Sequence, residues 1–473
     1  MSEIGQTLVR ELGADRVAED AATLAAHRTD YWILAHLRAR QGRLAGGPAC
    51  VVRPRSTAEV AAAVRAAQRL GVAIVPYGAG SGVVGGATPP DRSLVIDLSA
   101  MNALLEVHDT ALYARAQGGM LGGAYEAAVR ARGYTGGHYP QSIDRSTVGG
   151  WVATRAAGQF STRYGNIEDL CLGLEAVLPS GEVVRTALVP RASAGPSVRE
   201  IFLGSEGTLG VITEVTLRLH PLPERRELAS FAFPTFHDGL EAMRRIVRVG
   251  WRPAVLRLYD APEAARNFSA WATADACLLL VVSEGPAGLV DGELAASVAT
   301  ATALGGSAVG PEPVAHWLEH RNVVPSWDFF LDREMVADTI EVAATWDRLG
   351  ALHTAVTTAL GGVDGMLVAS GHSSHCYAQG ANIYFTFVLK PADFADAERL
   401  YLESWSRALR ATLDGGGTIS HHHGIGRLRA SWLAEELGSA YPVLLALKRT
   451  LDPAGVMNPG ALIAETAGSV RLT

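Results

Sequence analysis

The sequence predicts an α+β protein with more than one domain, and two observations carry this prediction. Near the N-terminus, a strand–helix–strand pattern runs directly into a glycine-rich turn. Beyond residue 223, the segments 227–283 and, less clearly, 366–412 each have the pattern of a helix between strands, which favours a cap domain with an antiparallel sheet. A chain of 473 residues is also too long for one hydrophobic core.

The first strand–helix–strand unit begins at residue 51 with two valines. Ser56 and Glu59 form a capping box at the start of the helix. Apolar residues then recur at helical spacing, at Val60, Val64, Ala67 and Leu70. Gly71 ends the helix, and residues 72–75 read as a buried strand.

The same patterns predict the later elements. They are a strand at 94–98, a helix between Gly118 and Gly133, a hairpin of 169–178 with 182–185, and a strand at 211–219. A proline corner at 221–223 marks a domain boundary. The last sixty or so residues hold a glycine–histidine loop, a helix from about Ser431 and an ending rich in proline and glycine.

Composition excludes several classes of protein. Hydrophobic residues make up 48% and charged residues 19%, which excludes a disordered chain, and the net charge of −7 with scattered basic residues argues against a nucleic-acid partner. The cysteines are far apart, the N-terminus lacks the apolar core of a signal peptide, and no apolar run is long enough to span a membrane. We therefore expect a cytoplasmic protein with reduced thiols and no membrane span.

A glycine-rich loop follows the strand at 72–75. Residues 80–85 match the dinucleotide pattern GxGxxG, but residues 86–91 cannot begin the helix that such a turn must open into. We expect instead that Gly78, Gly80 and Gly82 adopt positive φ and turn their amides inward, as a backbone nest for a diphosphate. From this loop alone, an ordinary glycine-rich turn remains an equal alternative.

Two later stretches favour the diphosphate-binding loop over an ordinary glycine-rich turn. Residues 141–151 and 204–212 combine small hydroxyl side chains with glycines, which allows the backbone to approach a flat cofactor. With PYGAGSG, the motifs STVGGW, TRAAG and GSEGTLGVITEVTLRL occur in an order that resembles the vanillyl-alcohol oxidase / p-cresol methylhydroxylase superfamily of FAD enzymes. The resemblance covers residues from about 54 to 460.

This resemblance implies a two-subdomain FAD-binding domain of the p-cresol methylhydroxylase type plus an α+β cap domain with an antiparallel sheet. The expected parts are an N-terminal helical segment (1–46), the FAD-binding domain (47–222), the cap or substrate domain (223–412), and a C-terminal segment that returns to the FAD domain (413–473). The implied cofactor-binding residues are Pro76, Tyr77, Gly78, Ala79, Gly80, Ser81, Gly82, Gln141, Ser142, Ser146, Thr147, Gly149, Gly150, Thr154, Ala157, Glu206, Gly210 and Ile212.

The FAD is expected to be bound without a covalent bond. Members of the superfamily that tether the flavin commonly carry a histidine in the glycine loop, and Gly80-Ser81-Gly82 offers none.

Within the superfamily the chain most resembles the alkylglycerone-phosphate synthase family. The matching pieces are GHYPQSIDRSTVGGW, YGNIEDL, RLYD, a Trp-Asp pair, CYAQGANIYFTF and, most specifically, SHHHGIGRLRASWL. The catalytic residues that this likeness implies are Tyr384, His421, His422, His423, His138 and Arg257. For His138 the alternative is a buried structural histidine, and for Arg257 a solvated salt bridge of the cap.

Tyr384 also makes chemical sense on its own. Strand alternation from Ile383 to Leu389 places the isoleucine, both phenylalanines and the leucine on one face, so Tyr384 and Thr386 point to the other. A phenol there can act as an acid or base beside an imidazole of the residues 421–423. The alternative is an aromatic strand that only packs.

No metal ligands are expected, and incidental binding of zinc by neutral imidazoles is left open as an alternative. Related 2-hydroxy-acid dehydrogenases hold a divalent ion with two histidines and a glutamate, and this chain has Tyr384 and His422 at two of those three positions. The synthases also carry a substrate-contacting arginine where this chain has Trp327, which weakens the case for a phosphorylated substrate. Arg427 and Arg429 remain as candidate anion partners.

Three functions are compared on this basis. The first is a synthase-type reaction without net oxidation, in which flavin N5, Tyr384 and the His421–His423 cluster act on a small keto or hydroxy substrate. The second is an oxidase or dehydrogenase of a hydroxylated substrate, with hydride transfer to the flavin. The third, a flavin-binding protein without catalysis, conflicts with the retained tyrosine and histidines. The expected partner is a small-molecule substrate, and a homodimer is left open.

Overall fold

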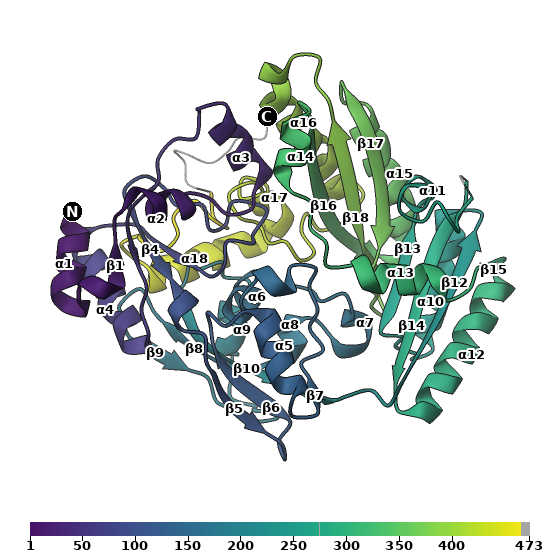
Figure 1. The fold of residues 1–473 in the computed structure, drawn as a ribbon, viewed down its shortest axis with the longest axis horizontal. Coiled ribbons are helices and arrows are strands. Elements are labelled where there is room, and N and C mark those ends of the chain that lie inside the picture. Colours follow the sequence, from purple (N-terminus) through teal and green to yellow (C-terminus); the bar gives the residue numbers. More distant parts are fainter. Residues whose placement is uncertain (274, 465–473) are drawn as a thin grey trace.

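The computed structural model describes residues 1–273 and 275–464. Two smaller sheets lie on one side of the molecule and one large sheet on the other (Figure 1). The expected α+β class, with an antiparallel sheet in the cap, is confirmed. Short 3₁₀ turns also occur, at Ala14–Arg16, Leu98–Ala100, Ile143–Arg145, Phe394–Asp396 and Gly438–Ala440.

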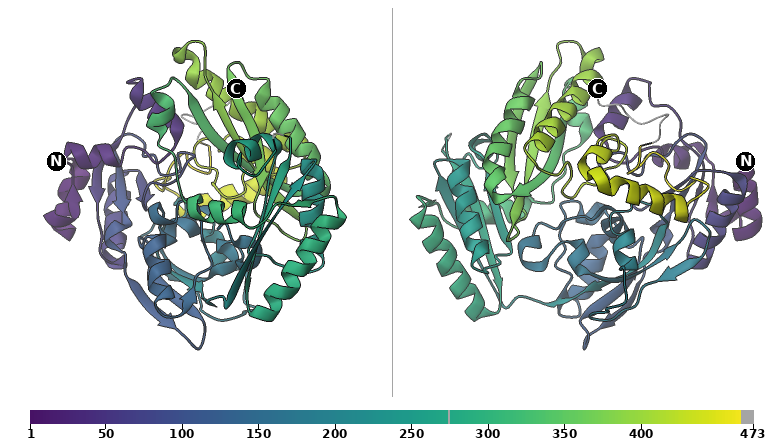
Figure 2. Two further views of the ribbon diagram at one scale, coloured as in Figure 1. Left: turned by 45° about the vertical axis from the view of Figure 1, so that its right-hand side comes forward. Right: turned by 180° about the vertical axis from the view of Figure 1, so that it is seen from behind.

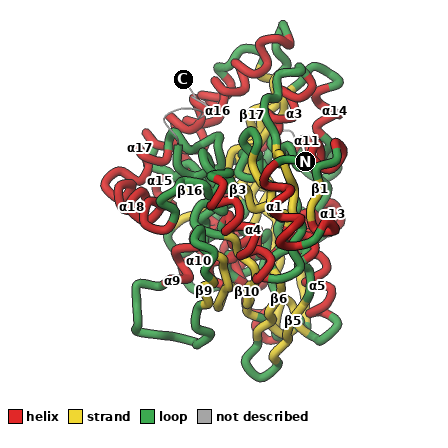
Figure 3. Tube along the Cα trace, turned by 90° about the vertical axis from the view of Figure 1, so that its left-hand side faces the viewer, coloured by secondary structure: helices red, strands yellow, loops and turns green. Residues whose placement is uncertain are grey.

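The first unit is a four-stranded sheet in the order β1-β2-β4-β3, in which β2, β4 and β3 run parallel and β1 is antiparallel. Its strands are β1 (Val17–Ala18), β2 (Pro48–Val52), β3 (Ile74–Tyr77) and β4 (Ser93–Asp97), and the helices of this part are α1 (Glu3–Leu12), α2 (Ala21–Ala26), α3 (Ile33–Arg40) and α4 (Thr57–Leu70). Helices α1 and α4 pack together on its outer side (Figure 3).

Helix α4 begins and ends where the sequence predicts. Ser56 Oγ accepts a hydrogen bond from Glu59 N, and Gly71 ends the helix in the left-handed region with φ of 62°. The predicted capping box is only half formed. The Glu59 carboxylate instead accepts hydrogen bonds from Arg55 N and the Arg16 guanidinium. It is therefore not bonded to the Ser56 amide, as a complete capping box would require.

The second unit is a five-stranded antiparallel sheet in the order β5-β6-β10-β8-β9. Its strands are β5 (Leu104–His108), β6 (Tyr113–Gln117), β8 (Cys171–Val177), β9 (Val183–Arg185) and β10 (Val211–Arg218). Its helices are α5 (Gly122–Arg130), α6 (Val148–Thr154), α7 (Ser161–Tyr164), α8 (Ile167–Leu170) and α9 (Val198–Phe202). The short strands β7 (Tyr134–Thr135) and β11 (His220–Pro221) pair with each other. The predicted β8–β9 hairpin is confirmed. The exposed loop between β9 and α9 projects from this unit (Figure 3).

The cap is one seven-stranded antiparallel sheet in the order β15-β12-β14-β13-β17-β18-β16. Its strands are β12 (Arg225–Phe233), β13 (Val255–Tyr259), β14 (Cys277–Gly285), β15 (Ser307–Ala308), β16 (Val336–Thr345), β17 (Met366–Ser373) and β18 (Gly380–Leu389), and its helices are α10 (Phe236–Arg248), α11 (Ala261–Asn267), α12 (Ala287–Ala303), α13 (Glu312–His320), α14 (Trp327–Leu331), α15 (Trp346–Gly361) and α16 (Ala397–Asp414). Helices α10, α12, α15 and α16 pack on this sheet (Figure 2).

One prediction for the cap is wrong. The segment 366–412 does not place a helix between strands: β17 and β18 come first and α16 follows them. The helix that lies between strands is α15, which is preceded by β16. The sequence pattern hides β16 because two of its buried residues, Asp338 and Glu341, are carboxylates.

The two ends of the chain join the halves of the molecule. Trp32 Nε1, at the start of α3, donates to the Tyr401 hydroxyl of cap helix α16 at 3.1 Å. After α17 (Leu433–Leu437) and α18 (Tyr441–Leu451), the chain returns to the first sheet, where Met457 lies in a parallel bridge beside Ile74 of β3. Figure 2 shows this C-terminal segment in yellow, running across the back of the molecule.

The cysteines and the helices agree with the sequence analysis. All four cysteines, Cys50, Cys171, Cys277 and Cys376, are buried and free. Among the described residues, no helix combines the length and the apolar character that crossing a lipid bilayer requires.

Candidate active site

A cavity of about 990 Å³ lies between the two smaller sheets and the cap sheet. Every predicted cofactor-binding residue lines it, from Pro76 in β3 to Ile212 in β10. The same cavity is lined by Arg257, Tyr384, His422 and His423 of the predicted catalytic set. His421 and His138 are not among its lining residues. The fold therefore brings the expected cofactor loops and most of the expected catalytic side chains to one place.

The glycine loop fits a group that approaches its backbone, but not entirely as predicted. Residues 78–92 contain no helix, which confirms that this is not a Rossmann turn. Of the three glycines, only Gly80 has positive φ, at 66°, so that expectation is wrong for Gly78 and Gly82. Glycine is needed at those positions for space: a Cβ on Gly78 would lie 2.5 Å from Thr147 Oγ1, and one on Gly82 3.2 Å from Asp30 Oδ2.

Helix α6 forms the adjacent wall. Thr147 caps it by accepting from Gly150 N at 3.2 Å, and a Cβ on Gly149 would lie only 2.7 Å from Gly118 O. The glycine pair therefore lets the helix pack directly on the backbone of the second unit. Ser146 Oγ accepts from Trp151 Nε1 at 2.7 Å, which fixes the indole beneath the wall.

Glu206 holds the C-terminal loop from the side of the second unit. Its carboxylate accepts backbone hydrogen bonds from Ile425 at 2.6 Å and Gly426 at 2.8 Å, and its own backbone is left-handed with φ of 49°. Burial raises the pKa of Glu206 to about 7 against the effect of these donors. Glu206 lines the cavity, yet its carboxylate is committed to the loop.

Glu341 of β16 holds the same loop from the side of the cap. It is fully buried, and its Oε1 accepts from the backbone amides of His421, His422 and His423 at 3.2, 3.2 and 2.8 Å. Arg429 donates to both of its oxygens, at 3.0 and 2.5 Å. Burial acts to raise the pKa of Glu341, but the Arg429 charge and the surrounding donors hold it well below its usual value.

The expectation that Arg429 is available to an anionic substrate is therefore wrong. Its side chain is wholly buried, and its guanidinium bonds Glu341 and the carbonyl oxygen of Ile419 at 2.7 Å.

The three adjacent histidines point in different directions. His423 Nδ1 lies 3.1 Å from Glu341 Oε2, and His421 Nε2 lies 2.6 Å from the Tyr377 hydroxyl. His421 is thus directed at Tyr377 rather than at Tyr384. Two of the three rings approach Tyr384: His422 stacks on it with ring centroids 5.9 Å apart, and His423 meets it edge-on at 5.5 Å. Burial lowers the pKa of His421 to about 4 and that of His422 well below its usual value, so both rings are neutral near pH 7.

Tyr384 points into the cavity, as strand alternation predicts. Ile383 and Phe385 on either side of it are buried on the opposite face of β18, while Tyr384 and Thr386 line the cavity. Its ring stacks on His372 at 4.8 Å. Burial raises the pKa of Tyr384, so the phenol keeps its proton and is a hydrogen-bond donor at neutral pH.

Arg257 is positioned by a chain of hydrogen bonds. Its Nε donates to the Tyr259 hydroxyl at 2.6 Å, and its Nη2 lies 2.6 Å from His372 Nε2. His372 Nδ1 in turn lies 2.9 Å from a Glu263 carboxylate oxygen. The alternative of a solvated salt bridge for Arg257 is wrong: no carboxylate forms an ion pair with it within the described part of the chain.

His138 is buried, with 2% of its surface exposed, and its ring packs 4.6 Å from that of Trp151. Neither ring nitrogen has a hydrogen-bond partner among the described residues, and burial lowers its pKa to about 3. It lies beneath the site and does not line the cavity.

Sequence reasoning missed several side chains of the site. His372, His375 and Arg321 all line the cavity. Arg321, between α13 and α14, donates to Gln159 Oε1 at 2.6 Å and lies over the Phe160 ring at 5.2 Å. None of them sits in a periodic pattern. The sequence does place His372 at the position of one metal-ligating histidine of the 2-hydroxy-acid dehydrogenases, and His375 follows it in the segment GHSSHCY, but neither was given a role.

Trp327, which the sequence analysis matches to an arginine of the synthases, lies in the cavity wall. Its indole Nε1 donates to Tyr31 O at 3.0 Å, and the two rings stack at 5.0 Å. This part of the wall is aromatic, and the Arg145 guanidinium lies close to the Tyr31 phenol.

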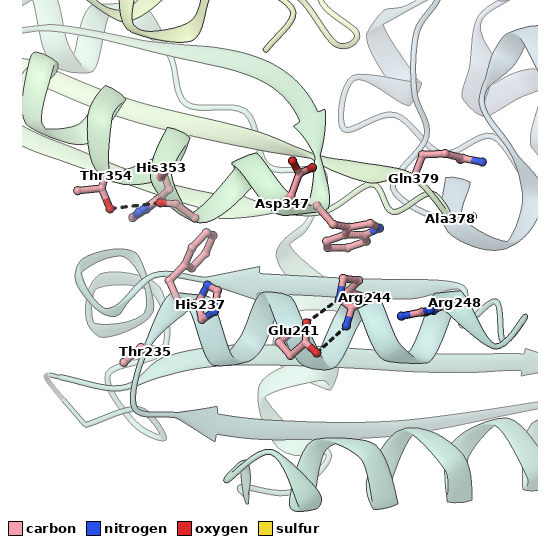
Figure 4. A pocket seen from close by; sticks show the side chains of 14 residues that line it. Thr235, His237, Glu241, Arg244, Arg248, Asp347, His353, Thr354, Ala378 and Gln379 are labelled. Carbon is pink, nitrogen blue, oxygen red and sulfur yellow. Dashed lines mark hydrogen bonds and ion pairs between the residues drawn. The ribbon is translucent and has the colours of Figure 1, made fainter. Parts of the chain in front are cut away.

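A second cavity, of about 740 Å³, lies in the cap between α10 and the start of α15 (Figure 4). Its side chains include the ion pair of Glu241 with Arg244, at 2.6 Å, and Asp347 lies on the opposite wall with its carboxylate turned away from that pair. No predicted site residue lines it, so it is not the site of the chemistry described above.

Two family models match the chain. The model described as "FAD binding domain" matches residues 48–187, and the one described as "FAD linked oxidases, C-terminal domain" matches residues 222–462.

Relatives of known sequence give the same result. The "Uncharacterized FAD-linked oxidoreductase YgcU" of Escherichia coli (strain K12) is 35% identical over 431 residues, which cover 88% of this chain and 89% of that protein. Alkyldihydroxyacetonephosphate synthase of Caenorhabditis elegans is 31% identical over 461 residues, 90% of this chain and 77% of that protein.

Solved structures agree. An alkyldihydroxyacetonephosphate synthase matches with a TM-score of 0.82 at 28% identity, over 97% of this chain and 86% of the other. A p-cresol methylhydroxylase with substrate bound matches with a TM-score of 0.79 over 98% of this chain and 96% of the other; at 16% identity it shows the fold alone.

We predict that the purified protein releases all of its FAD on acid precipitation. The described residues that line the cavity include no cysteine, and its histidines come from the cap and the C-terminal loop. The measurement is the absorbance of supernatant and pellet after precipitation. A pellet that stays yellow would contradict non-covalent binding.

We also predict that Arg429→Met destabilises the protein strongly, because it leaves the Glu341 carboxylate buried without its cation. Breaking a buried pair costs about 3–5 kcal/mol. The matched control is Arg410→Met, which removes an exposed ion pair with Glu435 and should cost less than about 1 kcal/mol. Melting temperatures of the three proteins test this. An equal drop in melting temperature in the two variants would be evidence against a structural role of the buried Glu341–Arg429 ion pair.

Proposed function

The chain belongs to the family of FAD-linked oxidases, and from that premise we propose that it transforms a small keto or hydroxy substrate, with Tyr384 and His422 as the groups that move protons. One observation carries this proposal. Tyr384, His422 and Arg257 line the same cavity as all of the residues expected to hold FAD. When bound, FAD supplies N5 of its ring, which exchanges electron pairs with a substrate carbon.

Arg257 is the group suited to hold a substrate oxygen. Two of its nitrogens are fixed by Tyr259 and His372, so the guanidinium keeps one orientation at the cavity wall. A fixed cation with remaining N–H donors stabilises negative charge on a carbonyl, carboxylate or phosphate oxygen. Glu263 fixes His372 from the other side, which makes both residues positioning groups for Arg257.

Tyr384 and His422 have complementary protonation states. The buried phenol keeps its proton and donates, whereas the neutral imidazole offers a lone pair and accepts. Their rings stack 5.9 Å apart, near enough for both to reach one small substrate. His138 receives no proton-transfer assignment, because it lies beneath the wall.

The synthase-type reaction is the first candidate. The likeness to alkyldihydroxyacetonephosphate synthase, at 31% identity over 90% of this chain, supports an exchange of an alcohol for a carboxylate on a keto substrate, without net oxidation. Arg257, Arg321, Arg145 and Arg266 line the cavity and supply positive charge for an anionic substrate.

Oxidation of a hydroxylated substrate is the second candidate, and Trp327 favours it. An indole stacked on Tyr31 stands in the cavity wall where the synthases have a substrate-contacting arginine. Loss of that cation suits a substrate with less charge, from which hydride would pass to the flavin.

Anaerobic mixing with candidate keto and hydroxy substrates separates the two reactions. For the synthase-type reaction we expect turnover while the flavin absorbance stays that of the oxidised form. Bleaching that persists until an electron acceptor is added would instead establish oxidation. A panel of both substrate classes that gives neither turnover nor bleaching would count against the proposed function.

We predict that Tyr384→Phe keeps its FAD and its melting temperature within a few degrees but loses about 10²–10⁴-fold in turnover. The substitution removes only the hydroxyl and preserves the ring that stacks on His372. His422→Ala should behave alike, and the double variant should cost little more than either single change if both groups serve one proton path. Thr386→Val, two residues along the same face of β18, is the matched control. Turnover near that of the control in Tyr384→Phe would leave this tyrosine as packing.

A further inference from the structure

Three imidazoles converge beside the catalytic side chains, from two separate parts of the chain. His375 lies in the turn after β17, whereas His421 and His422 lie in the C-terminal loop. Each offers one ring nitrogen, and the three nitrogens lie within 4.8 Å of one another. The ring of His375 stacks on His421 with centroids 5.0 Å apart and lies 5.1 Å from His422.

The outer hydrogen bonds of this cluster are those of metal-binding histidines. His375 Nδ1 lies 2.6 Å from Ser161 Oγ, and His421 Nε2 lies 2.6 Å from the Tyr377 hydroxyl. Asn166 Nδ2 donates to that hydroxyl at 2.6 Å, which fixes it in turn. Such partners on the far nitrogen orient an imidazole and hold the tautomer that leaves its other nitrogen free for a ligand.

The contact between His421 Nδ1 and His422 Nδ1, at 2.8 Å, is a hydrogen bond in which one nitrogen donates to the lone pair of the other. Without a cation, one of the two nitrogens must carry a proton for the other. Two nitrogens on a tetrahedral zinc ion lie about 3.3 Å apart, so a small rotation of either ring admits the ion. The displaced proton then has a place on His421 Nε2, which can donate it to the Tyr377 hydroxyl.

The chemistry of the cluster selects a class of ion. The three ligand atoms are all imidazole nitrogens, and no carboxylate or thiol belongs to the group. Ca²⁺ and Mg²⁺ prefer oxygen ligands, whereas three imidazoles suit Zn²⁺ and its neighbours in the transition series. The nearby carboxylate of Glu341 is already committed to Arg429 and to the loop amides.

We propose that His375, His421 and His422 form a binding site for one divalent transition-metal ion of the zinc class. His375 and His422 line the large cavity, so an ion there has an open fourth position for water or a substrate oxygen. This site differs from the metal positions of the hydroxy-acid dehydrogenases, which correspond here to His372, Tyr384 and His422. His372 is excluded because its two nitrogens face Glu263 and Arg257.

The proton transfer assigned to His422 belongs to the metal-free enzyme, and a bound ion is expected to inhibit it. A metal ion occupies the lone pair that an imidazole needs to accept a proton. Metal binding itself does not depend on the proposed function.

The test is a Zn²⁺ titration of the FAD-loaded enzyme, cleared of metal beforehand, in competition with a chromogenic chelator. We expect one tight site per chain, which His375→Ala abolishes. Ser161→Ala removes only the outer hydrogen bond and should weaken binding about 10- to 100-fold. His375 is buried, so His375→Ala could fail to fold. In that case the zinc affinity of Ser161→Ala tests the proposal.

Two control variants make the titration specific. His320→Ala removes the pair that His320 forms with His316 on α13, whose rings lie 4.3 Å apart, and His108→Ala removes a histidine on β5. Both should keep the tight site. Tyr384→Phe should bind zinc as the wild type does, whether or not it turns over, which separates this proposal from the proposed function. Equal zinc affinity in the wild type and Ser161→Ala, or loss of the tight site in His320→Ala, would overturn the proposal.

Discussion

The carboxylate of Glu341 is the group around which the site is organised. It lies fully buried on the outermost strand of the cap sheet and accepts from three successive histidine amides, while Arg429 supplies the neutralising charge. A buried ion pair contributes little to the net free energy of unfolding, since the desolvation of both charges opposes their attraction. Its effect here is geometric. With Glu206 holding Ile425 and Gly426 from the other domain, it fixes the loop 421–426 between two bodies that carry different halves of the site.

Much of the fold could be read from the sequence, because the relevant signals are local. Ser56 and Gly71 predict the two ends of helix α4, and the structure has Ser56 as its N-cap and Gly71 as its C-cap. The inward direction of Tyr384 follows from strand alternation alone, since buried apolar residues flank it on β18. The glycine-rich loop could be distinguished from a Rossmann turn because the residues that follow it cannot form a helix.

The rest could not be read because it depends on contacts distant in sequence. Strand β16 escapes a hydrophobic pattern, since Asp338 and Glu341 are buried polar residues whose partners, Tyr401 and Arg429, lie more than sixty positions away. Gly78 is glycine because Thr147 occupies its space, which a turn rule based on φ does not detect. The approach of His375 to the histidine loop likewise depends on how the cap closes on the C-terminal segment.

The return of the C-terminal segment has a consequence for how the protein is made. The residues that complete the first sheet beside Ile74, and the loop that Glu206 and Glu341 hold, are synthesised after β3 and β16. Until then Glu341 has neither Arg429 nor the loop amides, and β3 lacks its neighbour at Met457. The pocket can therefore close only after residues 421–457 have been made, so the order of synthesis places completion of the cofactor site after the strands of all three sheets.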